Sequence, residues 1–202
     1  MKPYLSVIIP VYNGADELPL TLIDVDKHLS QQDYSYEILI IDDGSDDNTA
    51  EITRKLTGLI KNLKLVTNTV TEGFGFAMRL GMLTAKGNWR IIMNYHNTTP
   101  VTEFNQMMPY LRQGFDVLIG SGGKDFWCFS EGAAQQIFSL TQAARWAFYY
   151  EFIVLAKLTN LKVKRLAPFY CQSVTTRPLD WWHWCWEFIK IRWRLGRKLY
   201  LN

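Results

Sequence analysis

Three clusters of polar side chains follow short apolar runs of the sequence, and their residue types suit ligand binding. The clusters are Tyr12-Asn13, Asp42-Asp43 and Asn94-Tyr95-His96-Asn97. A carboxylate pair such as Asp42 and Asp43 can accept hydrogen bonds from a base N–H and from ribose hydroxyls. The pair is therefore a candidate for nucleotide recognition.

The elements that must position these clusters alternate between strand and helix. Apolar runs predict strands at residues 5–11, 37–41, 63–66, 89–93, 116–119 and 161–166. Helical spacing of apolar residues predicts helices at 17–29, 47–59, 73–85, 104–111, 133–140, 143–158 and 180–201. This alternation indicates an α/β fold, a mostly parallel sheet flanked by helices. Ligands of such sheets bind beyond the carboxyl ends of the strands, so we expect the clusters to converge on one cleft.

The composition is that of a globular protein. The chain has 202 residues, of which 48% are hydrophobic and 20% charged. These values exclude a disordered or low-complexity chain and suit one compact domain. The N-terminal segment lacks a signal-peptide pattern, and no apolar run of about 18 residues predicts a transmembrane helix. Three Cys without CxxC spacing argue for a reducing compartment and against a structural zinc site.

The basic charge is concentrated in the last part of the chain. Residues 157–202 hold ten Lys and Arg but two Asp and Glu. On the predicted helix at 180–201 an apolar arc rich in tryptophan opposes a basic face. The members singled out for membrane or partner contact are Trp181, Trp182, Trp184, Trp186, Trp193, Lys190, Arg194 and Arg197. We expect contact with a membrane surface or an integral membrane protein complex, and not with nucleic acid. The alternative is a core helix with a solvated basic edge.

The opening motifs identify a family. Residues 6–18 (SVIIPVYNGADEL) and 36–49 (YEILIIDDGSDDNT) closely resemble family 2 glycosyltransferases. The segments at 73–81, 87–89 and 145–151, together with Pro100, resemble dolichyl- or polyprenyl-phosphate glycosyltransferases. This resemblance spans about residues 4–170. It implies a GT-A (Rossmann-like) fold, a nucleotide-sugar donor and a membrane lipid phosphate as acceptor.

The resemblance also implies which residues contact the donor. Asp42 and Asp43 stand where the first Asp pair of the family binds the nucleotide. Pro10, Tyr12 and Glu17 match donor-pocket positions of the family. These five residues are the candidate nucleotide-binding set.

The chain departs from the family at its catalytic positions. Where the family has an Asp-x-Asp that holds Mg²⁺ or Mn²⁺ on the donor diphosphate, this sequence has Asn94 and His96. An amide oxygen and an imidazole could still bind Mn²⁺ weakly, but we expect no metal. Tyr149 replaces the family's Asp base, and Glu151 survives nearby. A family Lys is Phe74, and the acceptor loop after residue 120 is largely missing.

Four losses in one catalytic apparatus favour a chain that no longer catalyses. We therefore expect a glycosyltransferase-like domain at 1–170 and a basic, Trp-rich membrane- or partner-binding segment at 171–202. The expected role is a peripheral subunit or binding module on the cytoplasmic face of a membrane, with no required cofactor. The alternative is an active inverting enzyme that moves a sugar from a nucleotide sugar to a polyprenyl phosphate, with Mn²⁺ or Mg²⁺.

Overall fold

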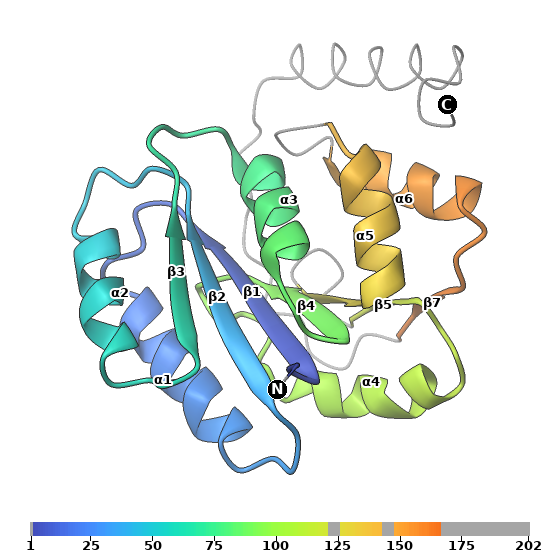
Figure 1. The fold of residues 1–202 in the computed structure, drawn as a ribbon, viewed down its shortest axis with the longest axis horizontal. Coiled ribbons are helices and arrows are strands. Elements are labelled where there is room, and N and C mark those ends of the chain that lie inside the picture. The colour runs from blue at the N-terminus through green and yellow to red at the C-terminus, as the bar shows by residue number, and fades with distance from the viewer. Residues whose placement is uncertain (1, 121–125, 143–147, 167–202) are drawn as a thin grey trace.

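The structure, a computed structural model, describes residues 2–120, 126–142 and 148–166 (Figure 1). The strands in this part of the chain are β1 (Leu5–Val11), β2 (Tyr36–Asp42), β3 (Leu63–Thr67), β4 (Trp89–Met93), β5 (Val117–Ile119), β6 (Phe126–Ser130) and β7 (Val163–Arg165). The helices there are α1 (Leu18–Leu29), α2 (Thr49–Thr57), α3 (Phe74–Thr84), α4 (Glu103–Arg112), α5 (Glu131–Leu140) and α6 (Phe148–Leu158).

The strands of these segments form one mostly parallel sheet. Their order is β3-β2-β1-β4-β6-β5-β7. β1 pairs in parallel with β2 and β4, and β2 pairs in parallel with β3. β6 runs antiparallel to both of its neighbours, β4 and β5. The predicted α/β class and the mostly parallel sheet are therefore confirmed.

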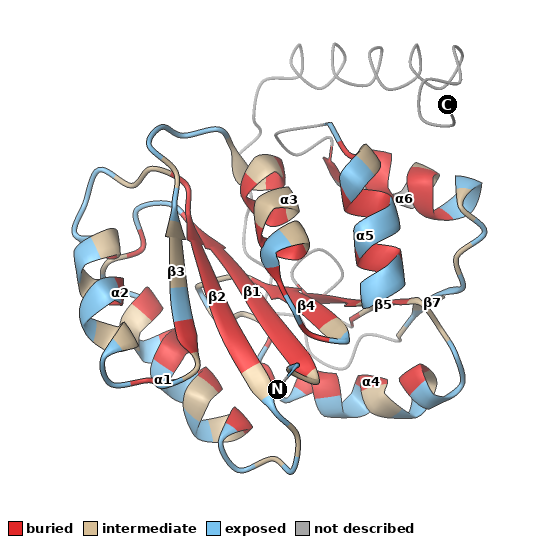
Figure 2. Ribbon diagram, viewed as in Figure 1, coloured by how far each residue is buried: buried red, intermediate tan, exposed pale blue. Residues whose placement is uncertain are grey.

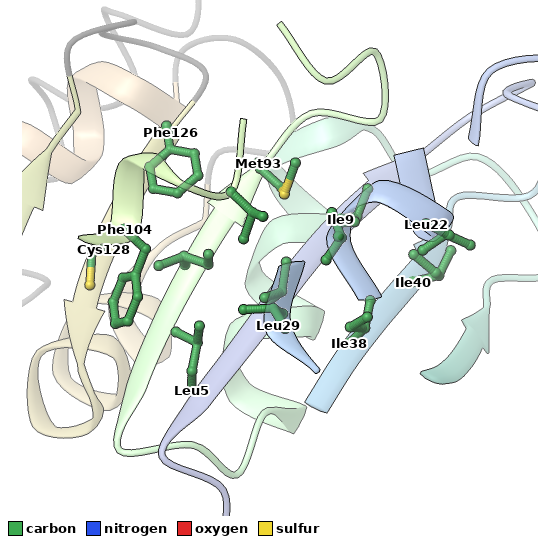
Figure 3. Packing of buried hydrophobic residues seen from close by; sticks show 14 of the residues in the cluster. Leu5, Ile9, Leu22, Leu29, Ile38, Ile40, Met93, Phe104, Phe126 and Cys128 are labelled. Atoms are coloured by element: carbon green, nitrogen blue, oxygen red, sulfur yellow. The ribbon is translucent and has the colours of Figure 1, made fainter. Parts of the chain in front are cut away.

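Helices cover both faces of the sheet and thereby bury the central strands on both sides. Ile8 of β1 and Ile41 of β2 pack with α3, α5 and α6 on one face. Ile9 and Ile40, one residue away, pack with α1 and α4 on the other. Figure 3 shows the second cluster from close by, and Figure 2 shows buried strands between helices whose outer sides are exposed. This period of two places every second side chain of a strand on the same face.

β6 was not predicted from the sequence. Its residues, FWCFS, follow the segment after residue 120 in which the family's acceptor loop is largely missing. In the structure they insert between β4 and β5, with Met93 paired to Phe126 and Ile119 paired to Trp127. Ser130 then caps α5 by accepting the N–H of Ala133 at 3.2 Å. The first four residues of β6 are buried, so the strand lacks the polar alternation that marks a half-exposed strand.

Several predictions concern residues outside the described part of the chain. The amphipathic helix at 180–201, with all its Trp, Lys and Arg candidates, lies there, and so does the division into 1–170 and 171–202. Both stay predictions. In the part of the chain that the structure describes, none of the helices combines the length and hydropathy needed to cross a membrane.

Candidate functional site

The polar clusters after β1, β2 and β4 contact one another at the carboxyl edge of the sheet. The hydroxyl of Tyr12 donates to the carboxylate of Asp46 at 3.1 Å, and the N–H of Asn13 donates to Ser45 Oγ at 2.9 Å. From the third cluster, the hydroxyl of Tyr95 donates to the backbone oxygen of Tyr12 at 3.4 Å. The predicted meeting of the three loops is confirmed by these contacts.

The carboxylate of Asp43 is occupied by its own chain. One oxygen accepts the backbone N–H of Gly73 at 2.7 Å. The other accepts the N–H of Glu72 at 3.1 Å and the side-chain amide of Asn68 at 2.9 Å. Asp43 is only 4% exposed. It therefore fastens the end of β2 to the loop that enters α3.

Asp42 closes the turn that follows β2. Its Oδ1 accepts the backbone N–H of Ser45 at 3.1 Å and the hydroxyl of Ser45 at 2.5 Å. Gly44 in this turn has a φ of +72°, and a Cβ there would lie 2.8 Å from the carbonyl carbon of Val70. The turn is therefore pressed against the β3–α3 loop, and glycine is required by both conformation and space.

The remaining donor-pocket candidates lie in different environments. Pro10 is buried within β1, where it pairs with Ile41 of β2. Tyr12 is the first residue after the strand and is 41% exposed. Glu17 is the N-cap residue of α1, and its carboxylate pairs with His96. Tyr12 and Glu17 therefore reach the carboxyl edge of the sheet, whereas Pro10 shapes the strand that leads to it. Nucleotide contact by these residues stays a prediction.

The side chains of Asn94 and His96 are hydrogen-bonded within the protein. Their partners and chemistry show whether they fit a divalent cation. The amide of Asn94 donates to Thr98 Oγ1 at 2.6 Å, and its oxygen accepts the N–H of Thr98 at 3.3 Å. The Nδ1 of His96 pairs with Glu17. Over residues 2–120, 126–142 and 148–166, no group of three or more His, Cys, Asp or Glu side chains is placed to hold a metal. Because Mg²⁺ on a diphosphate is held by carboxylate oxygens, these residues do not fit it.

The residues at and near the family's base position, Tyr149 and Glu151, lie in α6. Glu151 is fully buried, and its carboxylate accepts the backbone N–H of Gln142 at 3.0 Å. This bond holds the chain just beyond α5 to α6. The side chain of Tyr149, the residue that replaces the family's Asp base, lies outside the described residues, so its predicted role is untested.

Hydrogen bonds and neighbouring carboxylates shift two pKa values at this edge in opposite directions. Slight burial raises the pKa of Asp47, but the hydroxyl and N–H of Thr49 and the N–H of Ala15 outweigh it and lower the pKa overall. Burial, and then the charges of Glu17 and Asp47, raise the pKa of Tyr95. The Tyr95 hydroxyl therefore keeps its proton at neutral pH and acts as a donor.

Comparison with curated proteins gives two informative relatives. The chain is 29% identical over 216 residues to a dolichyl-phosphate beta-glucosyltransferase of Dictyostelium discoideum, which covers 81% of this chain and 65% of the relative. It is 32% identical over 144 residues to an undecaprenyl-phosphate 4-deoxy-4-formamido-L-arabinose transferase of Aeromonas hydrophila, covering 69% of this chain and 44% of the relative. The chain thus spans two thirds or less of the length of these relatives.

Solved structures share the fold. Mannosyl-3-phosphoglycerate synthase from Rubrobacter xylanophilus matches with a TM-score of 0.74 at 14% identity, covering 97% of this chain and 74% of its own. A mannosyltransferase from Pyrobaculum calidifontis, in complex with GDP-Man and Mn²⁺, matches with a TM-score of 0.66 at 16% identity, covering 88% and 59%. The model of the family described as glycosyl transferase family 2 matches residues 6–177. The chain therefore belongs to glycosyl transferase family 2.

Proposed function

We propose that this chain transfers a sugar from a nucleotide sugar to a polyprenyl phosphate. The observation that carries this proposal is the set of three loops joined at the carboxyl edge of the sheet, in a chain whose relatives are dolichyl- and undecaprenyl-phosphate transferases. Ligands of open α/β sheets bind at this edge. The proposed reaction breaks the bond between the sugar and the diphosphate, and an oxygen of the lipid phosphate forms the new bond.

The donor side of the proposed reaction rests on two kinds of residue. Asp42 and Asp43 shape the loops, because their oxygens accept hydrogen bonds from Ser45 and from the entry of α3. Tyr12 presents an exposed aromatic ring, which can lie against a base or a sugar. Because the residues at the family's metal position lack the carboxylates that hold Mg²⁺ on a diphosphate, we expect donor binding to persist in EDTA.

The acceptor of the proposed reaction would require the protein to work at a membrane. A polyprenyl phosphate is a membrane lipid, so the proposed reaction requires a peripheral association, here expected at the cytoplasmic face. The basic segment after residue 156 suits an anionic lipid surface. A membrane surface is therefore the first proposed partner, and an integral membrane protein is the second.

A transfer assay tests the proposal directly. Purified protein is incubated with radiolabelled UDP- and GDP-sugars and a polyprenyl phosphate in detergent, with EDTA or with Mg²⁺. We expect label in the lipid fraction under both conditions, and less with a Tyr12→Ala variant. The His28→Gln variant is the matched control, because His28 lies at the opposite end of α1 from the loops. Absence of labelled lipid with every donor would overturn the proposal.

A second candidate function is a non-catalytic member that binds the donor nucleotide or a membrane partner without turnover. The arrangement of Asn94 and His96 favours it, because both side chains are already hydrogen-bonded within the protein and neither is a carboxylate. Tyr149, in the place of the family's base, favours it as well. A thermal shift with UDP or GDP, combined with no transfer of label, would select this candidate over the first.

A further inference from the structure

The imidazole of His96 and the carboxylate of Glu17 form a hydrogen bond between two of the loops at the carboxyl edge. His96 comes from the β4–α4 loop, and Glu17 stands at the N-cap position of α1. Nδ1 of the imidazole faces the carboxylate, and both side chains stay substantially exposed, at 43% and 57%. Among the described residues Nε2 of His96 has no hydrogen-bond partner, so this nitrogen is available to a ligand.

The imidazole is held in a defined orientation from several sides. Its ring packs on Tyr95 with centroids 4.0 Å apart and an interplanar angle of 37°. The backbone oxygen of Tyr95 accepts the hydroxyl of Thr21 in α1 at 2.7 Å. A Cβ added at Gly14 would lie 3.0 Å from the Tyr95 ring, so the β1–α1 loop presses against that ring. The pair therefore belongs to a packed junction of two loops and a helix.

The charges of the surrounding loops make this imidazole distinctive. The loops at 12–17, 43–48, 68–73 and 94–102 contain several Asp and Glu residues and neither Lys nor Arg. His96 is the one side chain in these four loops that can carry positive charge. A diphosphate gains negative charge as it leaves the sugar, and that charge needs a compensating donor or cation.

We infer that His96 contacts the diphosphate of the donor in the place where relatives of this family use a metal, and that Glu17 is its positioning residue. This inference rests on the proposed function. The protonated imidazole has an N–H on each nitrogen. Nδ1–H donates to Glu17, and Nε2–H donates to a phosphate oxygen. As the bond between the sugar and the diphosphate breaks, its electron pair goes to the diphosphate oxygen, and no proton needs to move.

Nucleotide binding in EDTA tests the role of His96. Calorimetry compares uridine and guanosine with their diphosphates on the wild type, His96→Gln and the control His28→Gln. For uridine or for guanosine, we expect the wild type and the control to bind the diphosphate at least about tenfold more tightly than the nucleoside. We expect His96→Gln to lose that difference in affinity. Added Mg²⁺ should leave the wild-type affinity unchanged.

The role of Glu17 is tested by ring ¹⁵N signals of His96, which would not respond to a ligand if the Glu17–His96 contact were merely structural. The chain has three His, so the ring ¹⁵N signals are few, and His96→Gln identifies the relevant one. Inorganic pyrophosphate should shift the Nε2 signal of His96 and leave the His28 signal in place. Glu17→Gln should shift the Nδ1 signal without ligand and weaken diphosphate binding by up to about fivefold, and Glu17→Asp should restore part of both.

The outcomes separate this inference from the proposed function. If the wild type binds no nucleoside or diphosphate, the proposed function fails and the inference fails with it. If the wild type binds a diphosphate and His96→Gln binds it equally well, the inference alone is overturned. A diphosphate affinity that appears only with Mg²⁺, or a His96 signal that pyrophosphate does not move, would also overturn it.

Discussion

At the scale of single residues, the hydrogen bonds of the Asp43 carboxylate predict that its removal lowers the free energy of unfolding. It accepts the N–H groups of Glu72 and Gly73 and the amide of Asn68. Because Asn presents an NH₂ group where one oxygen stood, Asp43→Asn leaves a buried N–H without an acceptor. We expect this variant to lose about 1–3 kcal/mol of the free energy of unfolding, measured by urea denaturation.

Asp46→Asn provides the matched control for that measurement. Asp46 lies three residues further along the same loop but is exposed, and its carboxylate accepts the hydroxyl of Tyr12. We expect it to change the free energy of unfolding by no more than about 0.5 kcal/mol. Equal losses in the two variants would contradict the structural role of Asp43.

A second residue-scale prediction concerns Glu37, which is buried near the opposite edge of the sheet. Its carboxylate accepts the hydroxyl of Ser6 at 2.7 Å, the N–H of Lys86 at 2.7 Å and the ammonium of Lys64 at 2.8 Å. Burial alone raises the pKa of Glu37, but the bonds from Lys64, Lys86 and Ser6 outweigh it and lower the pKa below its ordinary value of 4.5. The folded protein thus binds this proton less tightly than the unfolded chain does.

The sign of the pH dependence follows from this lowered pKa. The contribution of Glu37 is fully present above pH 4.5 and is lost as the pH falls below that value towards the folded pKa. We expect Glu37→Gln to be about 1–3 kcal/mol less stable than the wild type at neutral pH, and to lose less further stability on acidification. Urea denaturation at several pH values measures both quantities. Glu72→Gln, at an exposed position, is the control. Parallel curves of stability against pH for the wild type and Glu37→Gln would contradict the role of the Glu37 carboxylate.

At the scale of elements, the contact of α3 with the sheet depends on the absence of a side chain at Gly81. A Cβ at this position would lie 2.4 Å from Ile8 Cγ2 in β1 and 2.9 Å from Ile41 Cγ1 in β2. Gly81→Ala must therefore push the helix off the sheet or displace buried side chains. We expect it to destabilise the protein by about 1–3 kcal/mol in thermal or urea denaturation.

Gly132 supplies the opposite expectation for the same substitution. It lies in α5, and a Cβ there would meet nothing within 4 Å. Because alanine is the better helix former, Gly132→Ala should leave stability unchanged or raise it by up to about 1 kcal/mol. A loss in Gly132→Ala similar to that in Gly81→Ala would show that helix geometry, and not packing on β1 and β2, sets the cost.

The elements themselves could be predicted to different degrees from the sequence. β1, β2 and β4 are apolar runs that end at polar residues, and local periodicity identifies both the strands and their ends. β6 carries no such signal, since it is buried and its neighbours β4 and β5 are joined to it by long-range pairing. Local patterns identify strands, but the place of a strand in the sheet depends on contacts between distant residues.

At the scale of the whole molecule, topology made the site predictable while the hydrogen bonds in it were not. The parallel order of β1, β2 and β4 is sufficient to bring Tyr12, Asp42 and Asn94 to one edge. Which donor each carboxylate accepts depends on loop conformation. Asp43 turns to the entry of α3, and Glu17 turns to His96. The glycine at position 73 is a signal that the sequence itself carries, because glycine favours turns with positive φ. In the structure its φ is 106°, and it lies in the turn whose N–H groups Asp43 accepts.

Membrane association is the property of the whole molecule that the segment after residue 170 predicts. If 180–201 is an in-plane amphipathic helix, burying each large apolar side chain contributes up to about 1.5–3 kcal/mol. Each cation near an anionic surface adds about 1 kcal/mol. The apolar contribution is therefore the larger one, since tryptophan and aliphatic side chains outnumber the cations on the opposite face.

The relative size of the two contributions predicts how the protein leaves a membrane. Replacing Trp182, Trp186 and Trp193 by Ser should release it from native membranes more completely than reversing the charge of Arg194 and Arg197. High salt should weaken the association, because screening acts on the cations alone, and detergent should abolish it. Flotation with anionic and neutral liposomes measures these differences. Complete release by salt would mean that the electrostatic contribution dominates, and indifference to liposomes would mean that the segment packs on its own domain or on a protein partner.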